Sequence, residues 1–156
     1  MPDRNYPTTV LELVDEQMQF KASALRAVKR FAELSPWRGS LDERKEKFRG
    51  LNKSLADAYG IPEPDLQFEM IDGSSSGSSH YIRALHRIVL EGKLSVVTFL
   101  HEFAHARGKG EQGACRWSIN LFRRCFPRQY SRLVGRGHML IKPSDVATEP
   151  RERRAS

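Results

Sequence analysis

The sequence predicts an α+β fold: a helical N-terminal half, then a small mixed sheet packed against one apolar helix and its supporting helices. Apolar residues recur at helical spacing through residues 10–59 and again through 93–125. Between these stretches, two short segments have strand character and are bounded by glycine, proline and serine. The chain has 156 residues, of which 39% are hydrophobic, which is enough for the core of one domain.

The N-terminal half carries two helix start signals. A capping-box pattern begins at Thr9, and a second one begins at Ser40. Apolar spacing predicts one long or broken helix from the first signal to about Leu34. It predicts a second helix from the other signal, which ends at Gly60 because glycine and a following proline favour termination.

The middle of the chain predicts the sheet. Residues Leu66–Met70 alternate between apolar and polar types, as a half-buried strand does. Residues Arg87–Leu90 form a second strand candidate, which the chain enters from Tyr81–Ile82. The Gly/Ser-rich stretch 72–79 between them predicts a loop that is too short to separate domains.

The C-terminal third predicts three helices. Residues 93–107 have helical apolar spacing, and Gly108 follows as a stop signal. A further amphipathic helix is expected over 111–125. Pro127 suits the first turn of a last helix that reaches about Val134.

The sequence predicts a single domain over 1–142 and a disordered tail over 143–156. The uncharged and mostly apolar run Leu94–Leu100 is far shorter than the roughly 20 residues of a membrane-spanning helix. The N-terminal residues lack a signal-peptide pattern, so we expect a cytoplasmic protein. Cys115 and Cys125 exclude a disulfide scaffold and are expected to be inert reduced thiols.

Positive charge is concentrated in one part of the chain. The net charge is +7, and residues 107–142 hold nine basic residues and a single acid, Glu111. On helices these side chains form stripes that predict either a nucleic-acid or acidic-protein partner, or simply a solvated face. The stripe residues are Lys109, Arg116 and Arg123, and then Arg128, Arg132 and Arg136.

The most informative residues are His101, Glu102 and His105, which form an H-E-x-x-H pattern inside a predicted helix. Residues four apart lie on the same helix face, so the two imidazoles can bind one metal ion. Zinc prefers such ligands and leaves a position open for water in catalytic sites. Glu102 is then placed to act as the general base toward a metal-activated water.

This pattern resembles the active-site helix of the zincin metallopeptidases, and the resemblance covers roughly Leu66 to Cys125. It implies a zincin-like domain with one zinc ion per chain. It also implies a strand beside the metal helix, which Arg87–Leu90 fits. An extended peptide substrate would then add to the sheet along that strand.

The resemblance also implies a third protein ligand, for which Glu111 is the candidate. The pattern His101-Glu102-x-x-His105-x-x-Gly108-x-x-Glu111 is similar to the metzincin arrangement, although metzincins carry histidine or aspartate at the last position. A gluzincin-like protein of the ImmA/IrrE type would also take a glutamate from the following helix. His138 is the alternative third ligand.

Other residues are weaker candidates for the same site. Tyr81 and Tyr130 are candidate hydrogen-bond donors to an oxyanion. His80 and His86 flank the expected strand and are candidates for supporting or substrate-contacting groups.

We therefore expect a zinc-dependent metallopeptidase. One alternative is a DNA-associated peptidase similar to the SprT-like group, which the basic stripes, Arg116, Arg123, Arg128, Arg132 and Arg136, would recruit to DNA. The other is a non-catalytic binding or regulatory protein in which zinc only stabilises the fold.

Overall fold

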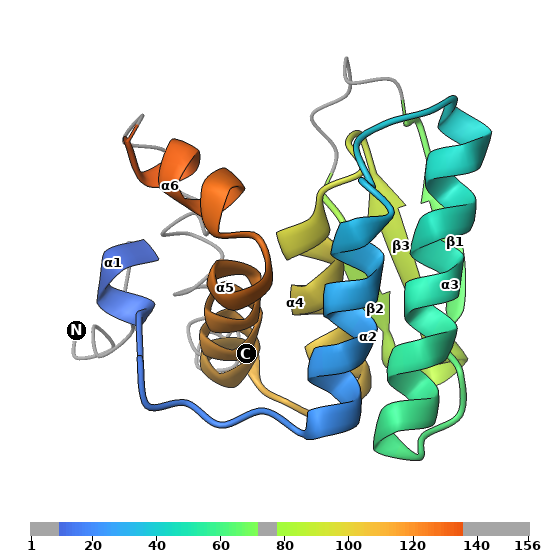
Figure 1. The fold of residues 1–156 in the computed structure, drawn as a ribbon. Coiled ribbons are helices and arrows are strands. Elements are labelled where there is room, and N and C mark those ends of the chain that lie inside the picture. The colour runs from blue at the N-terminus through green and yellow to red at the C-terminus, as the bar shows by residue number, and fades with distance from the viewer. Residues whose placement is uncertain (1–9, 72–77, 136–156) are drawn as a thin grey trace.

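The computed structural model describes residues 10–71 and 78–135 and has an α+β fold (Figure 1). A helical N-terminal part is followed by a three-stranded mixed sheet and by further helices, as the sequence predicts. The elements in chain order are α1 (Val10–Leu13), α2 (Ala22–Glu33), α3 (Leu41–Tyr59), β1 (Asp65–Glu69), β2 (His80–Ile82), the 3₁₀ turn η1 (Arg83–Leu85), β3 (Arg87–Glu91), α4 (Val96–Ala106), α5 (Glu111–Cys125) and α6 (Pro127–Gly135).

The sheet has the order β1-β3-β2, so β3 is its central strand. β1 runs parallel to β3, with Leu66 opposite Ile88. β2 runs antiparallel to β3, with Tyr81 also opposite Ile88. The chain reverses between β2 and β3 through η1 and His86, whose φ of 47° is left-handed.

This topology corrects the expected place of an added substrate strand. Residues Arg87–Val89 are paired with β1 on one side and with β2 on the other. A strand whose two edges are both hydrogen-bonded has no backbone groups left for a peptide. The prediction that a substrate lies along Arg87–Leu90 is therefore wrong in its location, and the antiparallel edge of this sheet is β2.

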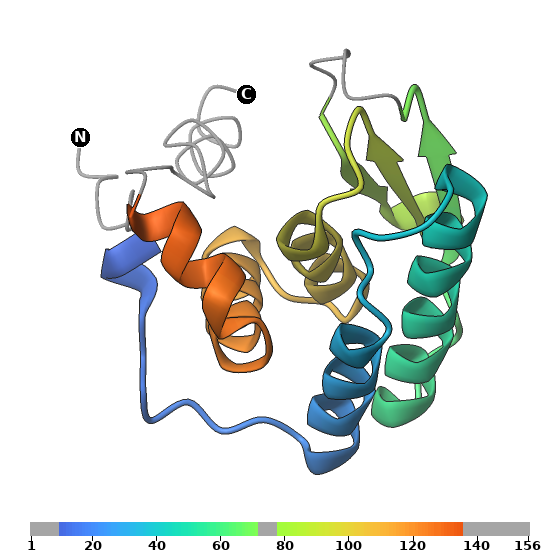
Figure 2. The same cartoon turned by 45° about the horizontal axis from the view of Figure 1, so that its top comes forward.

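Helix α4 occupies the middle of the molecule, between the sheet and α5 (Figure 2). It begins three residues later than Lys93, where the sequence places it, because the Ser95 hydroxyl caps it by accepting from the Thr98 amide at 3.3 Å. Phe99 and Phe103 are completely buried on this helix. The helix is therefore held on both sides, and its position is fixed by the core.

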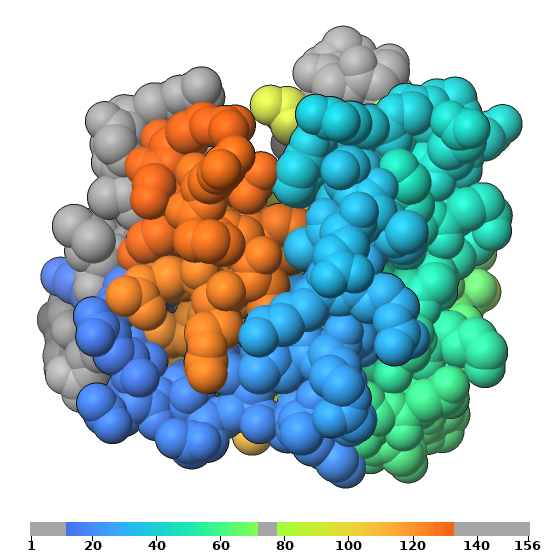
Figure 3. Space-filling view, in the orientation of Figure 1, coloured from blue at the N-terminus to red at the C-terminus, as the bar shows by residue number. Residues whose placement is uncertain are grey.

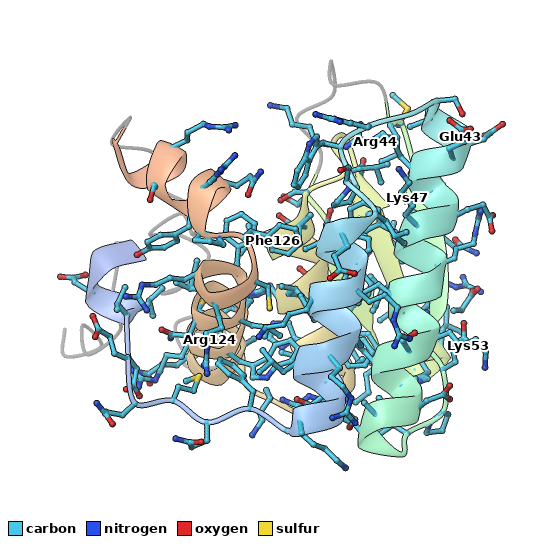
Figure 4. The ribbon with its side chains drawn as sticks, viewed as in Figure 1. Glu43, Arg44, Lys47, Lys53, Arg124 and Phe126 are labelled. Carbon is cyan, nitrogen blue, oxygen red and sulfur yellow. The ribbon has the colours of Figure 1, made fainter. Side chains whose placement is uncertain are left out.

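Aromatic side chains join the N-terminal helices to the C-terminal ones. The ring of Phe31 in α2 contacts Phe48 in α3 at 5.2 Å and Phe126 at 6.2 Å between centroids. Phe126 follows α5 and points from its end toward α2 (Figure 4). Phe48 contacts Phe99 of α4 at 6.0 Å. Edge-to-face pairs of this kind stabilise the core beyond their buried area.

The first predicted helix is broken, and residues 14–21 form an extended strap between α1 and α2. Figure 3 shows this strap along the edge of α5. The buried Asn120 side chain of α5 holds its start: it accepts from the Asp15 amide at 2.8 Å and donates to the Leu13 carbonyl at 2.9 Å. A charged hydrogen bond from Arg116 to Asp15 adds to this attachment.

We expect Asn120→Ala to lower the free energy of unfolding by about 2 kcal/mol, because it leaves the partly buried Asp15 amide and the buried Leu13 carbonyl without the Asn120 side chain as partner. Urea unfolding of the two proteins measures the change. Gln112→Ala removes an exposed amide from the same helix and serves as the control. Equal stability of the Asn120 variant and wild type would contradict this role of the strap.

Several sequence predictions concern residues beyond those that the structure describes. The boundary at residue 142, the tail over 143–156, Arg136 and His138 all lie outside the described residues. Among residues 10–71 and 78–135, no helix combines the length and the apolar character needed to cross a bilayer.

Candidate metal centre

Three predicted ligands converge at the junction of α4 and α5. The Nε2 atoms of His101 and His105 lie 3.2 Å apart. The two carboxylate oxygens of Glu111 divide between them: Oε1 lies 3.0 Å from His105 Nε2, and Oε2 lies 3.3 Å from His101 Nε2. The three predicted ligands His101, His105 and Glu111 therefore place their donor atoms at one point.

The short connection after α4 positions Glu111 and orients His105. Gly108 adopts a left-handed φ of 91°, which glycine reaches without strain, and the chain turns there toward α5. The Lys109 carbonyl then accepts a hydrogen bond from Nδ1 of His105 at 2.9 Å. This bond orients the ring so that Nε2 faces Glu111, the first residue of α5.

His105 and Glu111 stabilise each other's charged forms. Burial alone favours the neutral form of Glu111, but hydrogen bonds and charge from His101 and His105 outweigh it and lower the pKa of this carboxyl to about 2. Burial likewise lowers the pKa of His105, and its bonds to Glu111 and the Lys109 carbonyl outweigh this, so the net shift is upward. A metal cation bound at this point would replace the proton that His105 and Glu111 share in their hydrogen bond.

Glu102 lies beside the three donors with only 7% of its surface exposed. Burial raises the pKa of its carboxyl to about 7, and the charges of His101 and His105 oppose this rise only in part. The charge of His80 on β2 also lowers the pKa of Glu102. A carboxyl with a pKa near neutrality can both accept and return a proton at physiological pH.

Cys115 is a functional candidate that the sequence prediction missed, since it was expected to be inert. Its Sγ lies 3.7 Å from Glu111 Oε2 and 3.8 Å from His101 Nδ1, and the residue is fully buried. His101, Glu111 and Cys115 together could hold a metal ion. The signal was the spacing of four between Glu111 and Cys115, which places both side chains on one face of α5.

We expect Cys115→Ala to lower the affinity of the centre for a divalent metal by about 10- to 100-fold, the usual effect of losing a group that supports a ligand. The reason is that Sγ packs against both His101 and Glu111, so its loss frees their side chains. Competition with a metal-binding dye measures the change. Cys125→Ala, at the far end of the same helix, is the control, and an equal loss in both variants would contradict the prediction.

The two tyrosines are not brought to these ligands by any described contact. The Tyr81 hydroxyl donates to His86 Nδ1 at 2.8 Å, while His86 Nε2 donates to the Pro62 carbonyl at 2.7 Å. Tyr130 lies on α6 with Arg123 over its ring, and its buried hydroxyl has no partner among the described residues. Their assignment as oxyanion donors remains a prediction.

Part of the basic stripe on α5 has partners within the chain. Arg116 pairs with Asp15 at 3.1 Å, and Arg123 pairs with Glu16 at 3.3 Å. These two arginines therefore hold the strap to α5. Arg128 and Arg132 on α6 are exposed, and a nucleic-acid partner for the stripe remains a prediction.

Comparison with known proteins assigns no family to this chain. No family model matches it, and neither the curated proteins nor the solved structures contain a match. Any function therefore has to be inferred from the centre itself.

Proposed function

We propose that this protein is a zinc metallopeptidase with a zincin-like fold, in which His101, His105 and Glu111 bind the metal. The observation that carries the proposal is the spacing of their donor atoms, 3.0–3.3 Å from one another. In a tetrahedral site with zinc bonds of about 2.0–2.1 Å, neighbouring donor atoms lie roughly 3.3 Å apart. The donor set and its spacing therefore suit zinc, with one position left for water or substrate.

Zinc, when bound, supplies a Lewis acid that polarises a peptide carbonyl and acidifies water. Glu102 takes the proton from the attacking water and passes it to the leaving amine. A carboxylate suits both steps, because it can accept a proton and then release it. The Lys109 carbonyl keeps His105 in the orientation that presents Nε2 to the metal.

The substrate would lie along β2 in this proposal. β2 is an antiparallel edge strand, and it carries His80, whose charge reaches Glu102. A peptide that adds to this edge gains main-chain hydrogen bonds, and its carbonyl would then pass close to the metal centre. A mixed sheet with an antiparallel edge strand beside the metal helix also supports the zincin-like assignment.

The zinc content of the purified protein tests the centre. We expect one zinc per chain in wild type and in His138→Ala, and none in Glu111→Ala, by elemental analysis after dialysis. His86→Ala removes a histidine that bonds to Tyr81 and Pro62 and serves as the control. Zinc retained by Glu111→Ala but lost from His138→Ala would move the third ligand to His138, and a zinc-free wild type would overturn the proposal.

A second candidate function is a non-catalytic regulatory protein with a structural zinc. Cys115 favours it, because a thiol next to His101 and Glu111 offers a further protein donor. Structural zinc sites have four protein ligands and no open position. The Glu102 variant described in the Discussion separates the two functions.

A further inference from the structure

A cavity of about 370 Å³ lies on the side of α5 that faces away from the metal centre. Gly113, Arg116 and Trp117 line it from α5, whereas Glu111 and Cys115 lie on the opposite face of the same helix. The strap and the end of α3 also line this partly open cavity, through residues such as Phe20 and Tyr59.

The walls of this cavity are strongly basic. Lys21, Arg107, Lys109 and Arg116 all line it, and no aspartate or glutamate does. Arg116 is paired with Asp15, but the other three basic residues form no ion pair within the described part of the chain. Uncompensated charges of one sign around a single cavity repel one another and attract an anion.

Arg107 is the most constrained of these cations. Its guanidinium carbon lies 3.9 Å from the centre of the Tyr59 ring and 4.9 Å from that of Trp117. The Lys21 ammonium lies over the same Tyr59 ring at 5.8 Å. The buried Nε–H of Arg107 has no acceptor among the described residues, and burial lowers the pKa of this group. The aromatic rings thus hold the guanidinium in place at the wall of the cavity.

We propose that this cavity is a binding site for a small dianion, namely inorganic phosphate or a phosphate monoester. A guanidinium fixed by stacking presents its donors in the fork that matches phosphate oxygens, and two lysines add charge. The volume exceeds that of the anion alone, which leaves room for a small organic group against the aromatic wall. The site lies apart from the metal ligands, so binding there does not depend on the proposed peptidase activity.

Trp117 provides a direct reporter of binding. The chain has two tryptophans, and Trp37 is 42% exposed, so Trp37→Phe leaves Trp117 as the sole indole while keeping an aromatic ring against Phe126. In this background, fluorescence is titrated with inorganic phosphate and, separately, with phenyl phosphate. Sodium chloride at matched ionic strength corrects for general screening.

We expect a saturable fluorescence change with both phosphates and none with chloride. Tighter binding of phenyl phosphate would show that the aromatic wall contacts the ester group, and equal binding would limit the ligand to the phosphate. Arg107→Gln should weaken binding about tenfold or more, because it removes a charged hydrogen-bond donor. Lys109→Gln, at an exposed position, tests the same prediction without a change to the stacked core.

The control is Lys53→Gln, which removes an equal charge from the exposed face of α3, away from the cavity (Figure 4). Glu102→Gln should bind phosphate as the reference protein does, which separates this site from the metal centre. The proposal is overturned if phosphate gives no saturable change, or if Lys53→Gln weakens binding as much as Arg107→Gln and Lys109→Gln do.

Discussion

Glu102→Gln is expected to lower the rate of peptide hydrolysis by about 10²- to 10⁴-fold while one zinc remains bound per chain. The amide has nearly the same shape as the carboxylate but cannot accept the proton from water. His101, His105 and Glu111 keep their mutual distances, because none of these distances involves Glu102. Hydrolysis of a casein or peptide-library substrate, measured beside the zinc content, gives both results.

Glu69→Gln provides the matched control, since Glu69 is an exposed glutamate at the end of β1. Its activity should equal that of wild type. A Glu102→Gln protein that hydrolyses peptides at the wild-type rate would exclude the general-base role. A wild-type protein that binds zinc but cleaves no peptide would favour the regulatory function with a structural zinc.

In the metal-free protein, the free energy of unfolding is expected to fall by about 3 kcal/mol as the pH rises from 4.5 to 7. The folded-state pKa of Glu102 is about 7, against an ordinary value of 4.5, so the folded protein holds a proton that the unfolded chain has released in this range. Burial favours the protonated form of Glu102 over its ionised form. The stabilisation is therefore complete below pH 4.5 and is lost as the pH passes 7.

The other titrating groups of the centre have separable effects. The raised pKa of His105 adds a loss of stability that begins above its ordinary value of 6.5. Glu111, with its pKa of about 2, gives stability that is present above pH 4.5 and is lost only in more acidic solution. Between pH 4.5 and 6.5 the decline should therefore come mainly from Glu102.

Urea unfolding in the presence of a chelator, at several pH values from 4.5 to 8, measures this decline. Glu102→Gln should flatten the curve between pH 4.5 and 6.5 and should be the more stable protein above pH 7. Glu69→Gln should follow wild type. If the Glu102 variant declines as steeply as wild type, another group causes the pH dependence.

The parts of the structure that sequence analysis predicted are those that local interactions determine. The capping box at Ser40 starts α3, and the left-handed Gly60 ends it, as expected. α5 occupies the predicted residues because glycine precedes it and a proline follows it closely. The two histidines of H-E-x-x-H face the same point because helix geometry requires it.

The parts that the sequence did not predict depend on contacts between distant residues. The central position of β3 depends on which strands pair with it, and this was not visible in the local pattern. The break after α1 depends on Asn120, which lies far along the chain from Asp15. The ion pair between Arg116 and Asp15 was likewise not predicted, because Asp15 lies far from the basic segment in the sequence. Burial of Cys115 against the metal ligands depends on how α5 packs on α4.

All the donor groups of the centre lie between His101 and Cys115, in two helices joined by a tight turn. Closing so short a loop costs little chain entropy, so the donors can meet before the sheet and the N-terminal helices have assembled. A metal ion would then also bind partly folded chains, and its gain in stability would be smaller than its affinity for the native protein implies. We therefore expect zinc to accelerate refolding. We also expect it to raise the melting temperature by less than its affinity for the native protein implies.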